Sequence, residues 1–202
     1  DPDIQRLRLC LEVAHNPVNN HAMFFFLHAD FNDIPTGDLL TISQASHRLS
    51  LSLYDLIRGR HISQLSLEDP DKVTSCVARL ERWYRLQFNA SLGETAEFIL
   101  NDSGLLAPLM ASPNRVERLE RLRLFFTMIK SLAAFTKYPR LKTLLDKLVL
   151  REKYNLTLSL TTQNGDIPAV RLMTAHKAKG LEFDVVFLTQ AVDRLWGDKK
   201  AR

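Results

Sequence analysis

Residues 170–188 read VRLMTAHKAKGLEFDVVFL, and this stretch decides how the rest of the chain is interpreted. Two short apolar runs, residues 170–173 and 185–188, flank a polar segment that holds a histidine, two lysines, a glycine and a glutamate. Such a pattern is typical of two buried strands joined by a compact functional loop. Buried parallel strands carry near-continuous apolar runs, and ligands in such sheets bind at loops beyond the carboxyl ends of strands.

The polar segment offers different groups to a nucleotide and to a phosphate. Gly180 can adopt a positive φ and permits the close approach of a ligand, while Glu182 is an acceptor suited to a ribose hydroxyl. Thr174 and His176 supply short donors suited to a phosphate group or to a relay between two sites. Two lysines are either phosphate contacts or plain surface residues: Lys177 and Lys179.

The order Thr-x-His-x-x-Lys-Gly-Leu-Glu-Phe followed by Val-Val-Phe resembles motif V of superfamily 1 DNA helicases of the UvrD, PcrA, Rep and RecB type. In those enzymes motif V links the ATP site, in the cleft between two RecA-like domains, to the path of single-stranded DNA. The resemblance implies that Gly180 and Glu182 lie on the nucleotide side. It assigns DNA binding or coupling to Thr174, His176, Lys177 and Lys179.

The resemblance also implies a division of the chain and a mainly α fold. Residues 1–160 are expected to form a multi-helix accessory domain similar to the 2B insertion that precedes motif V. Residues 161–202 are expected to form a link and the strand-loop-strand of motif V, a small β-containing fragment of the second RecA-like α/β domain. Because the chain starts at Asp1 and stops soon after an expected core strand, we interpret it as part of a larger protein.

Apolar spacing and turn residues predict the helices of the first region. Ser91 and Glu94 form a capping box, Gly104 is a helix-ending glycine, and Pro113 is expected to open the longest helix. The other predicted helices cover residues 4–13, a segment capped by Asn19 or Asn20, a segment reaching about residue 47, and residues 51–58, 71–88, 91–100 and 141–154.

Two helices are expected to present apolar stripes to the core. In residues 71–88 the stripe consists of Val73, Val77, Leu80, Trp83, Tyr84 and Phe88. In the long helix it consists of Val116, Leu119, Leu122, Phe125, Phe126, Met128, Ile129, Leu132 and Phe135. The opposite face of that helix is rich in arginine and could follow a DNA backbone. Because Glu117 and Glu120 are spaced to pair with Arg121 and Arg123, a solvated, ion-paired face is favoured.

One further segment departs from the pattern of UvrD-like helicases, and another can be interpreted in two ways. Asp33-Ile34-Pro35 stands where many related helicases carry Gly-Ile-Gly, whose backbone N–H groups contact duplex phosphates. A carboxylate repels phosphate and proline lacks an N–H, which argues against that contact and favours a RecB-like relative. Residues 156–161 alternate leucine with polar residues before Asn164-Gly165, which is typical either of a β-hairpin or of an extended link to a neighbouring domain.

Composition limits the class of protein. The chain has 202 residues, a formal net charge of +4 and two cysteines that form no Cys-x-x-Cys pair. Cys10 and Cys76 are therefore expected to be buried thiols in a reducing compartment. No apolar run approaches the roughly 20 residues that span a bilayer, so a soluble, intracellular protein without membrane contact is expected. The resemblance to DNA helicases implies a cytoplasmic, nucleoid-associated protein. The positive charge is compatible with a nucleic-acid partner.

The function implied by the resemblance is that of an ATP-dependent 3′-to-5′ DNA helicase, in which the accessory domain positions or gates DNA. ATP and Mg²⁺ would be its cofactors, and its partners would be single-stranded DNA, duplex junctions, the remaining RecA-like domains and nuclease or repair proteins. The sequence contains no Gly-x-x-x-x-Gly-Lys-Ser/Thr, no paired acidic residues ending a strand and no arginine finger after motif V. The chain alone is therefore expected to have negligible ATPase activity and weak, salt-sensitive DNA binding.

The alternative is an inactive helicase-like scaffold, or protein-interaction module, of a RecB- or AddA-type nuclease complex. No nucleophile, metal-ligand set or acid pair supports a free-standing enzyme.

Overall fold

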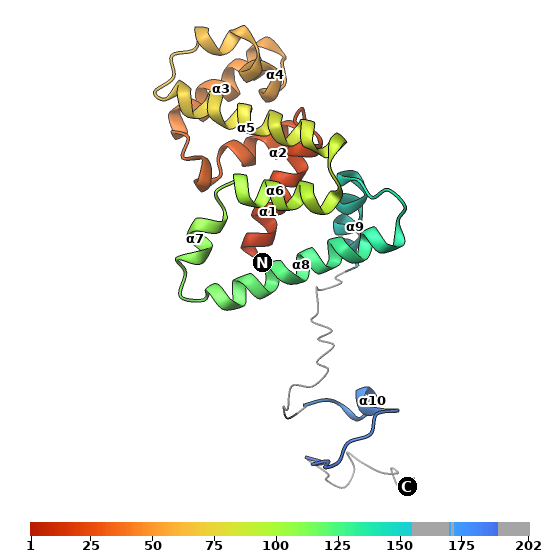
Figure 1. Cartoon of the computed structure of the whole chain (residues 1–202). Coiled ribbons are helices and arrows are strands. Elements are labelled where there is room, and N and C mark those ends of the chain that lie inside the picture. The colour runs from red at the N-terminus through yellow and green to blue at the C-terminus, as the bar shows by residue number, and fades with distance from the viewer. Residues whose placement is uncertain (155–169, 171, 190–202) are drawn as a thin grey trace, which may run out of the picture. The chain divides into compact units, whose positions relative to one another are not determined.

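The computed structural model describes residues 1–154, 170 and 172–189 (Figure 1). The chain divides into two compact units, Asp1–Leu160 and Thr161–Arg202. Within the described residues all regular structure is helical, which confirms the prediction of a mainly α protein. The choice between a hairpin and a link at residues 156–165 falls outside the described residues.

The helices of the first unit follow one another with short connections. They are α1 (Pro2–His15), α2 (Asn20–Leu27), η1 (Asp30–Asn32), α3 (Thr36–Leu49), α4 (Leu53–Arg58), η2 (Arg60–Gln64), α5 (Pro70–Asn89), α6 (Leu92–Asp102), α7 (Leu106–Met110), α8 (Arg115–Phe135) and α9 (Leu141–Lys153). None of the helices in the described parts of the chain is both long and apolar enough to cross a membrane.

Helix α1 lies at the centre of this unit and packs against α2, α5, α6, α8 and α9 (Figure 1). Leu7, Cys10, Leu11 and Ala14 are inaccessible to solvent and lie three or four residues apart, so they share one face of the helix. Val13, three residues after Cys10, is equally buried and widens this face. Because neighbouring helices cover α1 on several sides, α1 is the element on which the other helices are assembled.

Trp83 joins three helices in this core. Its ring makes an edge-to-face contact with Phe26 of α2, with the ring centroids 5.7 Å apart. The indole Nε1–H donates a hydrogen bond of 2.8 Å to Oδ2 of Asp102, at the end of α6. Arg82 donates to the same carboxylate, with Nη2 3.1 Å from each oxygen. The polar edge of a buried aromatic residue is thereby satisfied, as burial requires.

The stripe predicted for α5 is confirmed for Val73, Val77, Leu80 and Trp83, which are buried. It is wrong for Tyr84 and Phe88, which are 38% and 58% exposed. Gln87 takes the inward position instead, because its side-chain Nε2 donates a hydrogen bond of 2.8 Å to the carbonyl of Ala14 on α1. A satisfied amide can occupy a buried position that an apolar-only pattern would not assign to it.

Helix α6 begins after Ser91 as predicted and runs two residues past the predicted end at residue 100. The Ser91 hydroxyl accepts the N–H of Glu94 at 3.3 Å, and the Glu94 carboxylate accepts the N–H of Ser91 at 2.8 Å. The pKa of Glu94 is lowered, mainly by the hydrogen bond from the Ser91 side chain. After the helix, Gly104 has a φ of +84°, the left-handed conformation typical of a helix-ending glycine.

The longest helix, α8, differs from its prediction at both ends. It begins at Arg115 with Asn114 as the N-cap, so Pro113 precedes the helix and does not lie in its first turn. Leu122, Phe125, Met128, Ile129 and Leu132 are buried as predicted. The prediction of burial is wrong for Val116, Leu119 and Phe135, which are 71%, 38% and 89% exposed. Helix α8 has 21 residues, whereas α1 has 14 and α6 has 11, so α8 is the longest of the three. Helices α1 and α6 therefore cover only the middle turns of α8.

The two cysteines are buried free thiols, as predicted. Burial raises the pKa of Cys10, and it raises the pKa of Cys76 to about 11. Both pKa changes have desolvation as their largest cause, since the thiolate loses its hydration in an apolar core.

Candidate functional site

The polar segment predicted as a loop contains one turn of helix, α10 (Ala175–Ala178). Thr174 is its N-cap: the Thr174 hydroxyl oxygen accepts the N–H of Lys177 at 3.4 Å. The carbonyl of Thr174 accepts the N–H groups of Lys177 and Ala178, both at 3.0 Å. Threonine is a favoured N-cap residue because its side chain satisfies an N–H that the first turn leaves unpaired.

Gly180 ends this turn in the left-handed region, with a φ of +84°. The N–H of Leu181 bonds back to the carbonyl of Ala178 at 3.0 Å, which closes the turn. A Cβ at Gly180 would meet no atom within 4 Å, so the φ angle alone favours glycine here. The open space over Gly180 also leaves its backbone accessible to another molecule.

All six predicted site residues lie in this short turn and the two residues after it. Their side chains, and the backbone of Gly180, are exposed: Thr174, His176, Lys177, Lys179, Gly180 and Glu182. Within the described residues, the ionisable members of this set form no ion pair with one another or with a neighbour. Met173, Ala178 and Phe183 are half-buried, whereas the apolar Leu181 is 52% exposed.

The apolar runs on either side of the turn form no strand in the described residues, which differs from the sequence prediction. Val185, Val186, Phe187 and Leu188 are 70%, 69%, 86% and 60% exposed, and Val170 and Leu172 are 98% and 97% exposed. A strand is defined by hydrogen bonds to a neighbouring strand, and none is provided by the described part of the chain. Four consecutive exposed apolar residues are a surface that another element normally covers.

The turn at Asp33-Ile34-Pro35 presents a carboxylate that is paired with a lysine of α5. Asp33 has a φ of 51°, and its carboxylate lies 2.8 Å from Nζ of Lys72. The hydrogen bond from Lys72 lowers the pKa of Asp33, and the same bond raises the pKa of Lys72. Lys72 is therefore already engaged by the carboxylates of Asp33 and Asp69.

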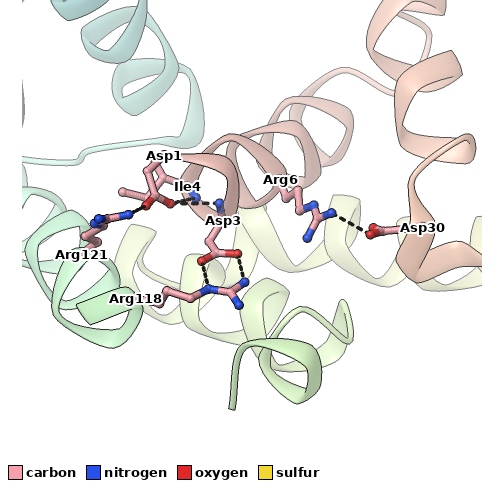
Figure 2. A network of polar contacts seen from close by, with 7 residues as sticks. All are labelled: Asp1, Asp3, Ile4, Arg6, Asp30, Arg118 and Arg121. Carbon is pink, nitrogen blue, oxygen red and sulfur yellow. Dashed lines mark hydrogen bonds and ion pairs between the residues drawn. The ribbon is translucent and has the colours of Figure 1, made fainter. Parts of the chain in front are cut away.

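The arginine-rich face of α8 is largely neutralised by acidic side chains (Figure 2). Arg118 forms a two-pronged pair with Asp3, with Nε–Oδ2 and Nη2–Oδ1 distances of 2.6 and 2.5 Å. Arg121 pairs with Asp1 at 2.6 Å and also with Glu117. Arg123 pairs with Glu120 at 2.9 Å. The predicted pairs with Glu117 and Glu120 are confirmed, whereas the partners at the start of α1 are far away in sequence and carry no local signal.

The described residues contain no group of three or more histidine, cysteine, aspartate or glutamate side chains placed to hold a metal ion.

The whole-chain comparison places this protein in a family: the family model of the UvrD-like helicase C-terminal domain matches residues 2–196, and the chain belongs to that family. Among curated proteins it is similar to an ATP-dependent helicase/nuclease subunit found in several bacteria. The protein of Ruminiclostridium cellulolyticum is 23% identical over 197 residues, which cover 93% of this chain and 15% of the relative.

Two other relatives with that name are more similar over shorter stretches. The protein of Desulfitobacterium hafniense is 29% identical over 140 residues, covering 65% of this chain and 10% of the relative. The protein of Natranaerobius thermophilus is 31% identical over 128 residues, covering 62% of this chain and 10% of the relative. The chain thus spans at most 15% of the length of these three relatives.

Proposed function

We propose that this chain is part of an ATP-dependent 3′-to-5′ DNA helicase: a 2B-like helical accessory domain in residues 1–160, followed by the motif V segment of a RecA-like domain in residues 161–202. The observation that carries the proposal is the Thr174-capped turn ending at left-handed Gly180, found in a chain of the UvrD-like family. Such a turn keeps polar side chains exposed on a fixed backbone.

In this proposal the two ends of the turn serve different ligands. The Thr174 hydroxyl oxygen accepts a backbone N–H, so its own hydrogen remains available to a DNA phosphate oxygen. His176, Lys177 and Lys179 lie on the same exposed turn and add donors for that phosphate. Glu182 accepts a hydrogen bond from a ribose hydroxyl, and the space over Gly180 permits the nucleotide to approach the backbone.

In this proposal the chain supplies contacts to the sugar of ATP but not to its phosphates or to Mg²⁺. Glu182 and Gly180 can contact the sugar, whereas the sequence has no phosphate-cradling glycine-rich loop, and the described residues hold no acidic group for a metal. ATP, when bound, supplies the free energy of hydrolysis. The residues of this chain orient the nucleotide and hold the DNA strand, and the phosphate-binding machinery would lie in other RecA-like parts of the protein.

A second candidate function is an inactive scaffold in a helicase/nuclease complex. Asp33 favours it, because this turn presents a carboxylate paired to Lys72 where related helicases present N–H groups to duplex DNA. The relatives are named as subunits of a helicase/nuclease, which is compatible with either function. The two candidates differ in whether nucleotide turnover responds to DNA.

The coupling role is tested with variants of the full-length protein in ATPase and DNA-binding assays. His176→Ala is expected to lower DNA-stimulated turnover about ten-fold while leaving the DNA-free rate unchanged, since it removes one hydrogen bond to a charged phosphate. Glu182→Gln is expected to raise the KM for ATP with little effect on DNA affinity.

Lys142→Gln serves as the matched control, because Lys142 is exposed and paired with Asp146 on α9, away from the turn in sequence. Equal effects of all three substitutions, or an ATPase rate that DNA does not stimulate in the unsubstituted protein, would overturn the coupling role and favour the scaffold.

A further inference from the structure

A groove in the helical unit is lined by residues 88–93 around the turn between α5 and α6, by residues of the last turns of α8, and by residues 137–140, which lead to α9. Its volume is about 580 Å³, within the range of ligand-binding clefts. Buried Leu92 and Ile129 contribute to its lining, and the polar and aromatic side chains that matter here are Phe88, Lys130, Lys137, Tyr138 and Arg140.

The three cations of this groove differ from Arg118, Arg121 and Arg123 of α8, which are paired with carboxylates: Lys130 lies on α8, whereas Lys137 and Arg140 follow it. Lys130, Lys137 and Arg140 are exposed, and none of them forms an ion pair within the described residues. By contrast, Arg121 and Arg123 nearer the start of the helix are paired with carboxylates. Unpaired cations leave a positive potential at this end of α8.

Among the residues that the structure describes, no acidic side chain lines the groove. The acidic residue nearest in sequence to its lining is Glu94, whose carboxylate accepts the N–H of Ser91 at 2.8 Å. That capping bond fixes the Glu94 carboxylate on the backbone of α6. The positive charge of the groove is therefore not balanced by a carboxylate from this described lining.

Two large aromatic side chains stand beside these cations. Phe88 is 58% exposed and Tyr138 is 74% exposed, although side chains of this size are usually covered. Tyr84 packs edge-to-face on Phe88, with a centroid separation of 5.3 Å, and leaves Phe88 largely open. Nζ of Lys137 lies 5.7 Å from the centre of the Tyr138 ring. A cation and an exposed ring thus occupy adjacent positions along the chain.

We infer that this groove binds a single strand of nucleic acid, with phosphates on Lys130, Lys137 and Arg140 and bases stacked on Phe88 and Tyr138. Exposed aromatic faces alternating with cations are the chemistry by which proteins hold single strands without reading their sequence. A duplex would meet the cations but offers no unstacked base to the rings, and an acidic peptide would leave both rings uncovered. That the nucleic acid is DNA rests on the proposed function.

The test measures fluorescence anisotropy of a labelled oligothymidine of about 15 nucleotides, the length of one extended single-strand site, with the 202-residue chain. The variant Lys130→Gln, Lys137→Gln, Arg140→Gln is expected to weaken binding at least ten-fold, and to reduce the slope of log affinity against log salt by about 2. Tyr138→Leu is expected to weaken binding on the order of ten-fold, with the salt slope unchanged.

The control variant carries Arg85→Gln, Arg123→Gln and Lys142→Gln, three exposed cations that are paired with carboxylates. It changes the net charge by the same amount and is expected to bind the oligonucleotide within about two-fold of the unsubstituted chain. Equal losses of oligonucleotide affinity in both triple variants, or no measurable binding by the unsubstituted chain, would overturn the proposal that this groove binds a single strand.

Competition assays complete the test. Unlabelled oligothymidine is expected to displace the labelled strand at a lower concentration than a duplex of the same length or a polyglutamate peptide. Stronger competition by the duplex would overturn the proposal. Stronger competition by the peptide would also overturn it and would favour an acidic protein partner. These outcomes leave the helicase proposal standing, because it is tested separately through DNA-stimulated ATP turnover in variants of the motif V turn.

Discussion

Asp1 and Asp3 at the start of α1 show how two short side chains can fix a helix end and a distant contact together (Figure 2). Asp1 accepts the N–H groups of Asp3 and Ile4 at 2.9 and 3.2 Å, which caps the helix. Asp3 is then held facing Arg118 on α8, and its side chain is only 9% exposed. A capped helix end thus positions the acidic partner that neutralises Arg118, near the start of α8.

Asp3→Asn is expected to lower the free energy of unfolding by about 1–2 kcal/mol, since it removes a two-pronged, charge-assisted contact that solvent only partly screens. Urea unfolding followed by circular dichroism measures this change. Asp30→Asn is the control: Asp30 pairs with Arg6 in the same region, but its side chain is 66% exposed, and the expected loss is below about 0.5 kcal/mol. Equal losses would contradict the account.

The same pair makes stability depend on pH. The hydrogen bond from Arg118 lowers the pKa of Asp3 in the folded chain. The contribution of Asp3 is therefore fully present above the unfolded pKa of about 3.9 and is lost as the pH falls through the folded pKa. The difference in unfolding free energy between the unsubstituted chain and Asp3→Asn should be constant near neutral pH and shrink in acid. A difference that grows on acidification would show that the sign is wrong.

The buried thiols give a second prediction at this scale. With a pKa of about 11 for Cys76 and a raised pKa for Cys10, both thiols react poorly in the folded chain. At about pH 8 the thiolate fraction of Cys76 is on the order of 0.001. A chromogenic disulfide reagent should therefore titrate no thiol rapidly in native buffer and two in denaturant. Rapid reaction of either thiol in native buffer would contradict its burial.

At the scale of single elements, α6 could be predicted almost entirely from sequence because its end signals are local. The capping box of Ser91 and Glu94 and the left-handed Gly104 lie within three residues of the helix ends, and both are found as expected. The inward face of α5 was only partly predictable, since Gln87 is buried by a hydrogen bond to Ala14, a residue 73 positions away. The exposed ends of α8 depend likewise on how far the neighbouring helices extend.

Two glycines, one within α6 and one just after it, allow a test in which the same substitution has opposite effects. Gly93→Ala, within the helix, is expected to stabilise the chain by about 0.5–1 kcal/mol, because a Cβ there meets nothing within 4 Å. Gly104→Ala is expected to destabilise it by about 1 kcal/mol, because its φ of +84° is strained for alanine although space is available. Thermal unfolding of both variants should shift the midpoint in opposite directions, and shifts of the same sign would contradict the assignment of the helix end.

At the scale of the whole molecule, the core belongs to the helical unit. All the hydrophobic residues found buried in the described chain lie between Leu7 and Leu148. The turn at residues 174–180 has no comparable core among its described residues, and its flanking apolar residues are exposed. The expected strands could not be established from sequence for this reason: their letters fit a buried sheet, but a strand also requires hydrogen-bonding partners that the described residues do not supply.

It follows that residues 1–154 should fold without the remainder of the chain. This shorter chain is expected to unfold cooperatively in urea with the same midpoint as the 202-residue chain, since it contains every buried core residue named above. A lowered midpoint or loss of cooperativity, measured by circular dichroism, would mean that the residues after 154 contribute to the stability of the helical unit.

The candidate site was predictable to the extent that it is local. Thr174, His176, Gly180 and Glu182 fall in one turn because they are neighbours in sequence, and the left-handed φ of Gly180 follows from its residue type. The groove that contains Lys130, Lys137 and Arg140 was not predicted from sequence. Its lining residues Phe88 and Arg140 are far apart in the chain, and only the packing of α6 against α8 brings their surroundings together.

The measurement that tests the central claim most directly is strand separation by the full-length protein with ATP and Mg²⁺, on two duplexes that differ only in whether the single-stranded tail is 3′ or 5′. The account predicts ATP-dependent separation of the 3′-tailed duplex and little separation of the 5′-tailed one. A folded, DNA-binding protein that separates neither duplex, or only the 5′-tailed one, would contradict it.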